Sequence, residues 1–247
     1  MTNQSTVDKL LEMRLTTMAE SFQLQLQDPA YQELSFDERF ALMVDEEWLR
    51  RKNNKQARLI SHASFKFPSA CAEDIDYFPD RKLDKPLITR LTACNYIVDN
   101  RNVIIMGASG SGKSYLACAL GVAACRKFYT VRYIRLPDLL DELAMARGEG
   151  TFQKTIRQYK KVNLLILDEW LLTPLGDTAS RDLLEIIEAR DEGCSTIFCS
   201  QFAKAGWHER IMEGTISDAI LDRVIHNSYS LVIDGNLSMR ERHALKD

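Results

Sequence analysis

The hydrophobic positions of this chain follow two different patterns. In the C-terminal two thirds short apolar runs recur, and residues 103–106 (VIIM) and 164–167 (LLIL) contain no polar residue. A fully apolar run of this length is typical of a central parallel strand that is buried on both faces. Residues 130–136, 194–200 and 228–234 predict further strands. Helical segments separate the strands, so the pattern predicts an α/β fold with a parallel sheet between helices.

The first 70 residues follow a helical pattern instead. A first amphipathic helix is expected from apolar residues spaced three or four apart, which are Val7, Leu11, Leu15, Met18 and Phe22. A second apolar stripe runs over residues 36–48, directly after a sequence at 35–38 that matches a capping box. These short helices cannot bury much surface alone. We therefore expect a helical module at residues 1–70, for oligomerisation or partner docking, followed by the α/β domain at 71–247.

Residues 107–114 (GASGSGKS) join the first apolar run to a predicted helix at 115–124 and match G-x-x-x-x-G-K-[ST] at every fixed position. Glycines let the backbone approach an anion closely, and the loop amides and helix start then point at it. We expect Lys113 to bind the β- and γ-phosphates of a nucleotide and Ser114 to bind Mg²⁺. The residues expected to bind the nucleotide here are Gly107, Ala108, Ser109, Gly110, Ser111, Gly112, Lys113, Ser114 and Tyr115.

Asp168 and Glu169 directly follow the second apolar run. The carboxyl ends of parallel strands form the edge of the sheet where ligands bind. We therefore expect Asp168 to bind nucleotide and Mg²⁺ opposite Ser114, and Glu169 to polarise the attacking water as a general base. A strand that ends in acids is common, but its combination with a complete phosphate-binding loop predicts nucleotide hydrolysis.

Three further positions are candidates for the same chemistry. Ser200, at the end of the strand predicted at 194–200, could sense the γ-phosphate, although a strand-end turn explains it equally well. Arg223 could reach the nucleotide of a neighbouring subunit and stabilise the transition state. A basic residue near the C-terminus, Arg240 or Arg242, could contact bound nucleotide.

A basic run without any acidic residue occupies positions 50–58. Its members are Arg50, Arg51, Lys52, Lys55 and Arg58. Such a run is usually a solvated helix face, but it also fits contacts with a DNA backbone, and composition does not decide between the two. The formal net charge is −3, so any nucleic-acid site is a local patch.

The 6 cysteines form no C-x-x-C pair, and most lie in apolar surroundings. This favours reduced thiols in a cytosolic protein over disulfides or a zinc site. The sequence shows neither a signal pattern nor a long apolar run, so we expect a cytoplasmic protein without a membrane span.

The order of these segments resembles an AAA+ ATPase core, with GASGSGKS, then LLILDE, then a strand that ends in CSQ, then DRV. More narrowly, nearly all of the chain is similar to the IstB-like ATPases of insertion-sequence transposition, which are related to the DnaC-type helicase loaders. The opening VDKLLEMRLTTMAES through RRKNNK resembles the helical N-terminal module of that family. The closing SMRERHAL extends the likeness toward the C-terminus.

The resemblance implies a role for each motif. Residues 107–114 match the Walker A loop, Asp168 and Glu169 the Walker B pair, Ser200 the sensor I position, Arg223 the arginine finger and Arg240 the sensor II position. Many AAA+ proteins have Asn or Thr where this chain has Ser200. The family implies ATP and Mg²⁺ as cofactors, a homo-oligomer with ATP-bridged interfaces on double-stranded DNA, and stimulation of a partner transposase.

Two other functions remain open from the sequence. A DnaC-type helicase loader would use the same core to bind single-stranded DNA and a helicase. A nucleotide-gated DNA scaffold would bind ATP and barely hydrolyse it, although Glu169 argues for hydrolysis.

Overall fold

The computed structural model describes residues 3–191, 193–211, 214–235 and 238–244. The chain divides into two compact units, Met1–Arg58 and Leu59–Asp247. Residues that follow the division, among them Ala63, Phe65 and Ala70, are buried in the core of the second unit. The sequence analysis placed the boundary at residue 70. The division between the two compact units falls earlier, between residues 58 and 59.

The N-terminal unit consists of α1 (Asn3–Glu12), α2 (Thr16–Gln27), the short 3₁₀ helix η1 (Pro29–Glu33) and most of α3 (Phe36–His62). The expected continuous helix over residues 7–22 is wrong, because the chain turns at Arg14, whose φ is 60°. The amides of residues 14 and 15 donate back to carbonyls of the last turn of α1. Such a Schellman-type end terminates one helix and lets the next fold back against it.

Helix α3 begins with the predicted capping box, which is confirmed. The amide of Ser35 donates to Glu38 at 2.8 Å, and the amide of Glu38 donates to the Ser35 hydroxyl at 3.3 Å. Farther along α3, the carboxylate of Glu47 accepts bonds from the amides of Thr17 at 2.9 Å and Met18 at 3.2 Å. These amides begin α2 and lack helical partners. Glu47 therefore ties α2 to α3.

The second unit is built on a parallel sheet in the order β2-β3-β4-β1-β5. Its strands are β1 (Asn102–Gly107), β2 (Val131–Arg135), β3 (Leu164–Asp168), β4 (Ser195–Ser200) and β5 (Ser228–Ile233). Each strand agrees with a segment where the sequence predicted one, to within one residue at either end, and the predicted parallel sheet is confirmed. Because the strands are parallel, their carboxyl ends meet at one edge.

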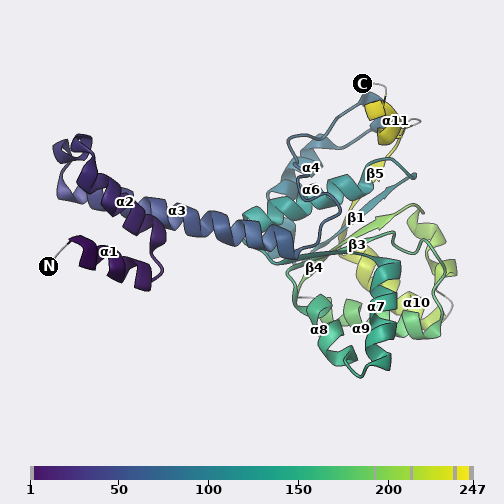
Figure 1. Ribbon diagram of the computed structural model, residues 1–247. Coiled ribbons are helices and arrows are strands. Elements are labelled where there is room, and N and C mark those ends of the chain that lie inside the picture. Colours follow the sequence, from purple (N-terminus) through teal and green to yellow (C-terminus); the bar gives the residue numbers. More distant parts are fainter. Residues whose placement is uncertain (1–2, 192, 212–213, 236–237, 245–247) are drawn as a thin grey trace. The chain divides into compact units, whose positions relative to one another are not determined.

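Helices cover both faces of this sheet (Figure 1). One face packs against α4 (Lys85–Thr92), α5 (Asn95–Val98) and α6 (Lys113–Arg126). The other face packs against α7 (Leu136–Gly148), α8 (Phe152–Lys161), α9 (Asp177–Arg190) and α10 (Gly214–His226). Alternate residues of β3 enter the two cores, with Leu164 and Ile166 on the first side and Leu165 and Leu167 on the second. This is why the strand contains no polar residue before its end.

Helix α6 lies very close to the sheet. A Cβ placed on Gly121 would come within 2.5 Å of the Phe65 ring and 2.8 Å of Ile166. Only glycine fits at this position, so α6 and the loop before it are held firmly against the core.

The remaining elements are short. They are the 3₁₀ helices η2 (Pro79–Arg81), η3 (Lys204–Gly206) and η4 (His208–Arg210), and the C-terminal helix α11 (Met239–Ala244). All six cysteines are free thiols, as the sequence predicted. Among the described residues, no helix has both the length and the hydrophobicity needed to cross a bilayer.

Candidate active site

The predicted phosphate-binding loop lies between β1 and α6, at the carboxyl edge of the sheet. Gly110 and Gly112 have φ values of 77° and 96°, which residues with a Cβ rarely adopt. Gly112 is the N-cap residue of α6. The loop therefore leads directly into a helix start, whose first amides have no helical partner and can bind an anion. The strand–loop–helix context that the motif requires is confirmed.

Lys113 points back into this loop. Its side chain donates to the main-chain carbonyls of Gly107 at 2.8 Å and Ala108 at 2.7 Å, and the residue is only 8% exposed. Burial lowers the pKa of Lys113, while Cys199 and Asp168 nearby act in the opposite direction. Both hydrogen-bond acceptors are neutral carbonyls, so the ammonium brings net positive charge to the loop.

The structure brings Ser114 and Asp168 together, as expected for a magnesium site. The hydroxyl of Ser114 donates to Asp168 Oδ2 at 2.6 Å. The other carboxylate oxygen, Oδ1, accepts the amide of Glu169 at 2.9 Å. Asp168 is buried, and its position at the end of β3 follows from the parallel sheet. A serine hydroxyl and a carboxylate are hard oxygen donors of the kind Mg²⁺ prefers.

Two residues at the end of β2 belong to this site, and the sequence analysis missed both. Tyr133 donates its hydroxyl to Asp168 Oδ2 at 2.6 Å. Arg135 stands opposite Asp168 in the pairing of β2 with β3. The available signal was the alternation of Tyr133 and Arg135 at the carboxyl end of the strand predicted at 130–136. Burial raises the pKa of Tyr133, and the hydrogen bond to Asp168 raises it further, so the phenol stays a proton donor.

Glu169 is bound by Arg135 in this structure. An Nη2 of Arg135 lies 2.7 Å from Glu169 Oε2, and this hydrogen bond raises the pKa of Arg135. The backbone of Glu169 has a φ of 56°, in the left-handed region. That conformation turns the chain sharply away from β3 and sends the next residue, Trp170, into the core. The predicted general base is thus at the sheet edge but engaged in an ion pair.

Ser200 reaches the predicted edge but faces the interior. Its hydroxyl donates to the carbonyl of Trp170 at 3.2 Å and accepts bonds from the Phe202 amide and the Trp207 indole N–H, both at 3.1 Å. The side chain is fully buried. All hydrogen-bonding capacity of the hydroxyl is used within the fold. In this geometry Ser200 fixes the segment after Glu169, which agrees with the strand-end turn that the sequence left open beside the role of γ-phosphate sensor.

Arg223 is not brought near the loop of its own subunit. It lies on α10 and forms ion pairs with Glu188 at 3.1 Å and Asp191 at 3.5 Å. It borders a small cavity together with Asn102, the first residue of β1. Since β1 has 6 residues at about 3.3 Å each, the phosphate-binding loop begins roughly 17 Å away along the strand. Any contact of Arg223 with phosphate must therefore involve a second subunit.

Two arginines near the C-terminus, Arg240 and Arg242, were candidates for contact with bound nucleotide. The side chain of Arg240 lies outside the described residues. Arg242 forms an ion pair with Asp80 and packs over the Phe78 ring, with the guanidinium carbon 4.6 Å from the ring centre. The start of α11 also touches the loop, because the amide of Met239 donates to the carbonyl of Gly110 at 2.8 Å.

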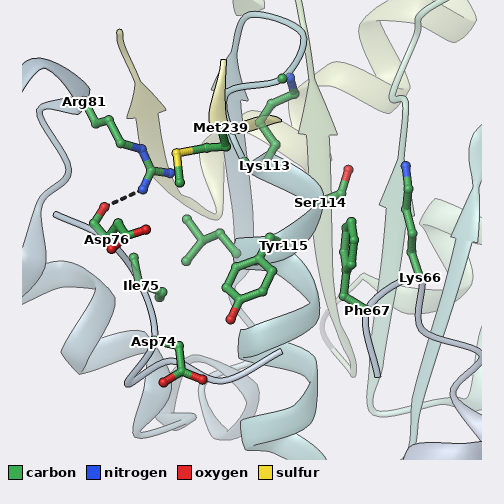
Figure 2. Close-up of a pocket in the computed structure, with 13 residues that line it drawn as sticks. Lys66, Phe67, Asp74, Ile75, Asp76, Arg81, Lys113, Ser114, Tyr115 and Met239 are labelled. Atoms are coloured by element: carbon green, nitrogen blue, oxygen red, sulfur yellow. Dashed lines mark hydrogen bonds between the residues drawn. The ribbon is translucent and has the colours of Figure 1, made fainter. Parts of the chain in front are cut away.

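A cavity of about 540 Å³ opens beside the loop. Figure 2 shows Phe67, Ile75 and Tyr115 around it, with Lys113 and Arg81 above. The Phe67 and Tyr115 rings are tilted by 56° with their centres 5.9 Å apart. A cavity of this size, lined by aromatic and aliphatic side chains together with charged ones such as Asp74 and Asp76, suits an aromatic base next to a bound phosphate chain. Phe67 and Ile75 lie on either side of residue 70, where the sequence analysis placed the domain boundary, and were not among the residues expected to bind the nucleotide.

Two residues of the basic run of α3 form ion pairs and hydrogen bonds within the N-terminal unit. Arg51 Nε lies 2.7 Å from Glu47 Oε1, and an Nη2 of Arg51 donates to the carbonyl of Arg14 at 2.8 Å. Arg50 approaches the same carboxylate at 3.5 Å. Lys52, whose ammonium lies 3.7 Å from the centre of the Trp48 ring, Lys55 and Arg58 are exposed. The first two arginines therefore stabilise the fold of this unit, and contact with DNA remains a prediction for the run as a whole.

Comparison with known proteins decides the family. The IstB-like ATP binding protein family matches residues 8–247. The chain belongs to this family. One relative, from Sinorhizobium fredii and named as an insertion sequence ATP-binding protein, is 41% identical over 237 residues, which is 96% of each chain. The IstB-like chain is thus an ATP-binding protein of the kind associated with insertion sequences, and the resemblance inferred from its motifs is confirmed.

The fold of the IstB-like chain is similar to the folds of several solved structures. The DnaC helicase loader superposes with a TM-score of 0.58 at 19% identity, over 67% of this chain and 97% of that one. AMPPCP-bound DnaA from Aquifex aeolicus gives a TM-score of 0.59 at 21% identity, over 72% of this chain and 55% of that one. At these identities the likeness concerns the fold, and the predicted AAA+ core is confirmed.

Proposed function

We propose that this IstB-like protein is a Mg²⁺-dependent ATPase that assembles on double-stranded target DNA, remodels it and stimulates a partner transposase. The observation that carries the proposal is the 2.6 Å contact between Ser114 and Asp168 beside the buried Lys113, in a chain of an ATP-binding family. A phosphate-binding loop next to a buried carboxylate is the arrangement that phosphoryl transfer requires.

Binding of ATP follows from the shape and charge of the site. The amides of residues 107–114 and the ammonium of Lys113 would bind the phosphates, and the cavity beside Tyr115 would accept the base. Ser114 and Asp168 would hold Mg²⁺, which when bound neutralises charge on the phosphates. Among the residues that the structure describes, no group of three His, Cys, Asp or Glu could hold a metal. This agrees with Mg²⁺, which takes most of its ligands from water and phosphate.

Hydrolysis would depend on Glu169. Its carboxylate would orient and polarise the attacking water once it separates from Arg135. Arg223 of one subunit would approach the nucleotide of the next and stabilise the charge that spreads over the transferred phosphoryl group. Such a contact links hydrolysis to assembly, because the site is complete only when two subunits meet.

The N-terminal unit would mediate assembly or dock a partner. Several large apolar side chains of α3 are exposed in this unit, among them Phe36 at 68% and Trp48 at 52%. The basic run that starts at Arg50 lies on the same helix and fits contacts with phosphates of DNA. Deletion of residues 1–58 should abolish oligomers on DNA, whereas an unchanged oligomeric mass would contradict this role.

Electron microscopy of the full chain with duplex or single-stranded DNA, with and without ATP, tests the proposal. We expect filaments or closed clusters on duplex DNA only with ATP. Lys113→Ala should form none, because it loses ATP binding, and Glu169→Gln should still assemble without turnover. Particles that form only on single strands would favour a helicase loader.

Two alternatives each have an observation in their favour. The likeness to the fold of the DnaC helicase loader supports a loader, and pull-down with a helicase against a transposase separates the two. The ion pair of Glu169 with Arg135 supports an ATP-gated scaffold with little turnover. Phosphate release measured with DNA present decides between a scaffold and an active ATPase.

A further inference from the structure

One buried arginine beside the phosphate-binding loop has no role in any of the motifs. Arg81 ends η2 and is 5% exposed. An Nη2 of Arg81 donates to the main-chain carbonyl of Ser111 at 3.0 Å, and Nη1 donates to the carbonyl of Asp76. Figure 2 shows the guanidinium among the side chains that line the cavity, next to Met239.

The guanidinium lies directly against the loop backbone. A Cβ placed on Gly112 would come within 2.9 Å of the Arg81 Nη2 atom. The carbonyl of Arg81 itself accepts the amide of Asp234, just after β5, at 3.1 Å. Arg81 is therefore fixed from both sides, with its backbone tied to the sheet and its side chain tied to the loop.

The charge of Arg81 lacks a hydrogen-bonded carboxylate partner among the described residues. Both of its acceptors are neutral carbonyls, and its Nε is buried without a hydrogen-bond partner. The adjacent carboxylate of Asp80 is paired with Arg242. Burial lowers the pKa of Arg81; Asp76 and Asp80 oppose this shift and Arg242 adds to it. A buried charge is costly unless an opposite charge offsets it. Together with Lys113, this leaves two buried cations at the loop that an anion would compensate.

The bond to Ser111 has a direct consequence for the loop. The carbonyl of Ser111 and the amide N–H of Gly112 belong to the same peptide group, so a cation on the oxygen fixes the direction of the N–H and polarises it. We propose that Arg81 is a positioning residue that holds this peptide ready to bind the phosphates of the nucleotide. The inference rests on the proposed function in one respect, namely that the loop binds the phosphates of ATP.

Substitution of Arg81 tests this role. Displacement of a fluorescent ATP analogue measures the affinity for ATP and for inorganic triphosphate, which has no base. In Arg81→Gln we expect both affinities to fall by the same factor, about tenfold, since a hydrogen bond to a charged group is removed. Arg81→Lys keeps the charge and should recover part of both affinities. A loss for ATP alone, or no loss for either ligand, would overturn the proposal.

A second buried arginine serves as the control for stability. Arg190 donates to the carbonyls of Tyr159, Val162 and Ser195 and touches no part of the loop. Arg190→Gln should lower Tm without changing triphosphate affinity below Tm. If Arg81→Gln is too unstable to assay, Arg81→Lys is the deciding variant. It loses the forked geometry of the guanidinium, so full wild-type affinity for ATP and triphosphate would contradict a positioning role. Failure of the wild-type chain to bind ATP would instead refute the proposed function.

Discussion

Arg135 at the end of β2 holds the carboxylate of Glu169 at the end of β3, with 2.7 Å between Nη2 and Oε2. The register of the two parallel strands, which places Arg135 opposite Asp168, sets this contact. Asp138 also lies 3.4 Å from the same guanidinium. The residue best placed to polarise water is therefore occupied by a cation from its own subunit. In the proposed mechanism, Glu169 would exchange this partner for water before hydrolysis.

Removal of this ion pair should raise basal turnover. Arg135→Ala frees the Glu169 carboxylate. The ion pair is partly exposed to solvent and is therefore worth about 1 kcal/mol or less. We expect the rate of ATP hydrolysis without DNA to rise by up to about fivefold. ATP affinity should not change. Steady-state phosphate release measures the effect, and the double variant with Glu169→Gln should be inactive. If Arg135→Ala were as inactive as Glu169→Gln, Arg135 would instead belong to the catalytic groups.

A second prediction concerns the phenol that contacts Asp168 in the proposed magnesium site. Tyr133 and Ser114 both donate to Oδ2 of Asp168. Partners that orient a metal ligand typically contribute about tenfold or more to metal affinity. Tyr133→Phe should therefore lower the Mg²⁺ affinity of the ATP-bound protein by about tenfold, and leave ATP binding in EDTA nearly unchanged. Calorimetry measures the two quantities in separate titrations, of Mg²⁺ into the ATP-bound protein and of ATP into the protein in EDTA.

Tyr159 offers a matched control for Tyr133. Its hydroxyl also donates to a carboxylate, that of Glu142, and its side chain is fully buried. Tyr159→Phe removes an equivalent bond that does not involve Asp168. It should reduce stability without changing the response to Mg²⁺. Equal effects of the two variants on Mg²⁺ affinity would show that the loss comes from general destabilisation.

The sequence predicted the parts of the site that local patterns encode. The apolar runs before Gly107 and Asp168 identify strands buried on both faces, and parallel strands bring Ser114 and Asp168 to one edge. Tyr133 and Arg135 were missed because their roles depend on which strand pairs with β3 and in which register. That information is absent from the spacing of residues along a single segment.

Tertiary contacts decide two other positions in a similar way. The sequence left open whether Ser200 senses the nucleotide or belongs to a strand-end turn; its hydroxyl binds Trp170 and Trp207, whose bulk fills the core behind the strand end. The helix break at Arg14 was missed because apolar spacing continues across it, while Glu47 and Arg51 of α3 stabilise the turn and the helix start that follows. In both cases a tertiary contact decides what the local pattern does not.

The contact of Glu47 with α2 makes this unit sensitive to acid. Burial alone would raise the pKa of Glu47, but bonds from Arg51, Met18 and Thr17 and the charge of Arg50 outweigh it and hold the pKa below its ordinary value of 4.5. The carboxylate thus stabilises the fold above about pH 4.5, and this contribution disappears as the pH falls through the lowered pKa.

Hydrogen exchange by mass spectrometry can follow this effect. At neutral pH, Glu47→Gln should exchange faster than wild type over residues 16–27, because the α2 amides no longer have a charged acceptor. The difference between variant and wild type should shrink as the pH falls through the lowered pKa of Glu47. Comparison at each pH cancels the intrinsic pH dependence of exchange. A difference that persists at low pH would show that Glu47 acts through packing and not through its charge.

The last prediction separates structural from DNA-binding roles in the basic run. Arg50 and Arg51 bind Glu47, so their removal would disturb the N-terminal unit, whereas Lys52, Lys55 and Arg58 can be replaced with those bonds intact. The triple alanine variant of these three should weaken duplex binding and flatten its dependence on salt, by about 0.9 in log–log slope for each phosphate that is no longer neutralised. A matched control removes the same charge from the exposed face of α8, at Lys154, Arg157 and Lys161. Fluorescence anisotropy measures both variants between roughly 50 and 200 mM salt, a range over which phosphate binding weakens steeply. If only the α8 variant flattens the slope, the DNA contacts lie on the ATPase unit and not on α3.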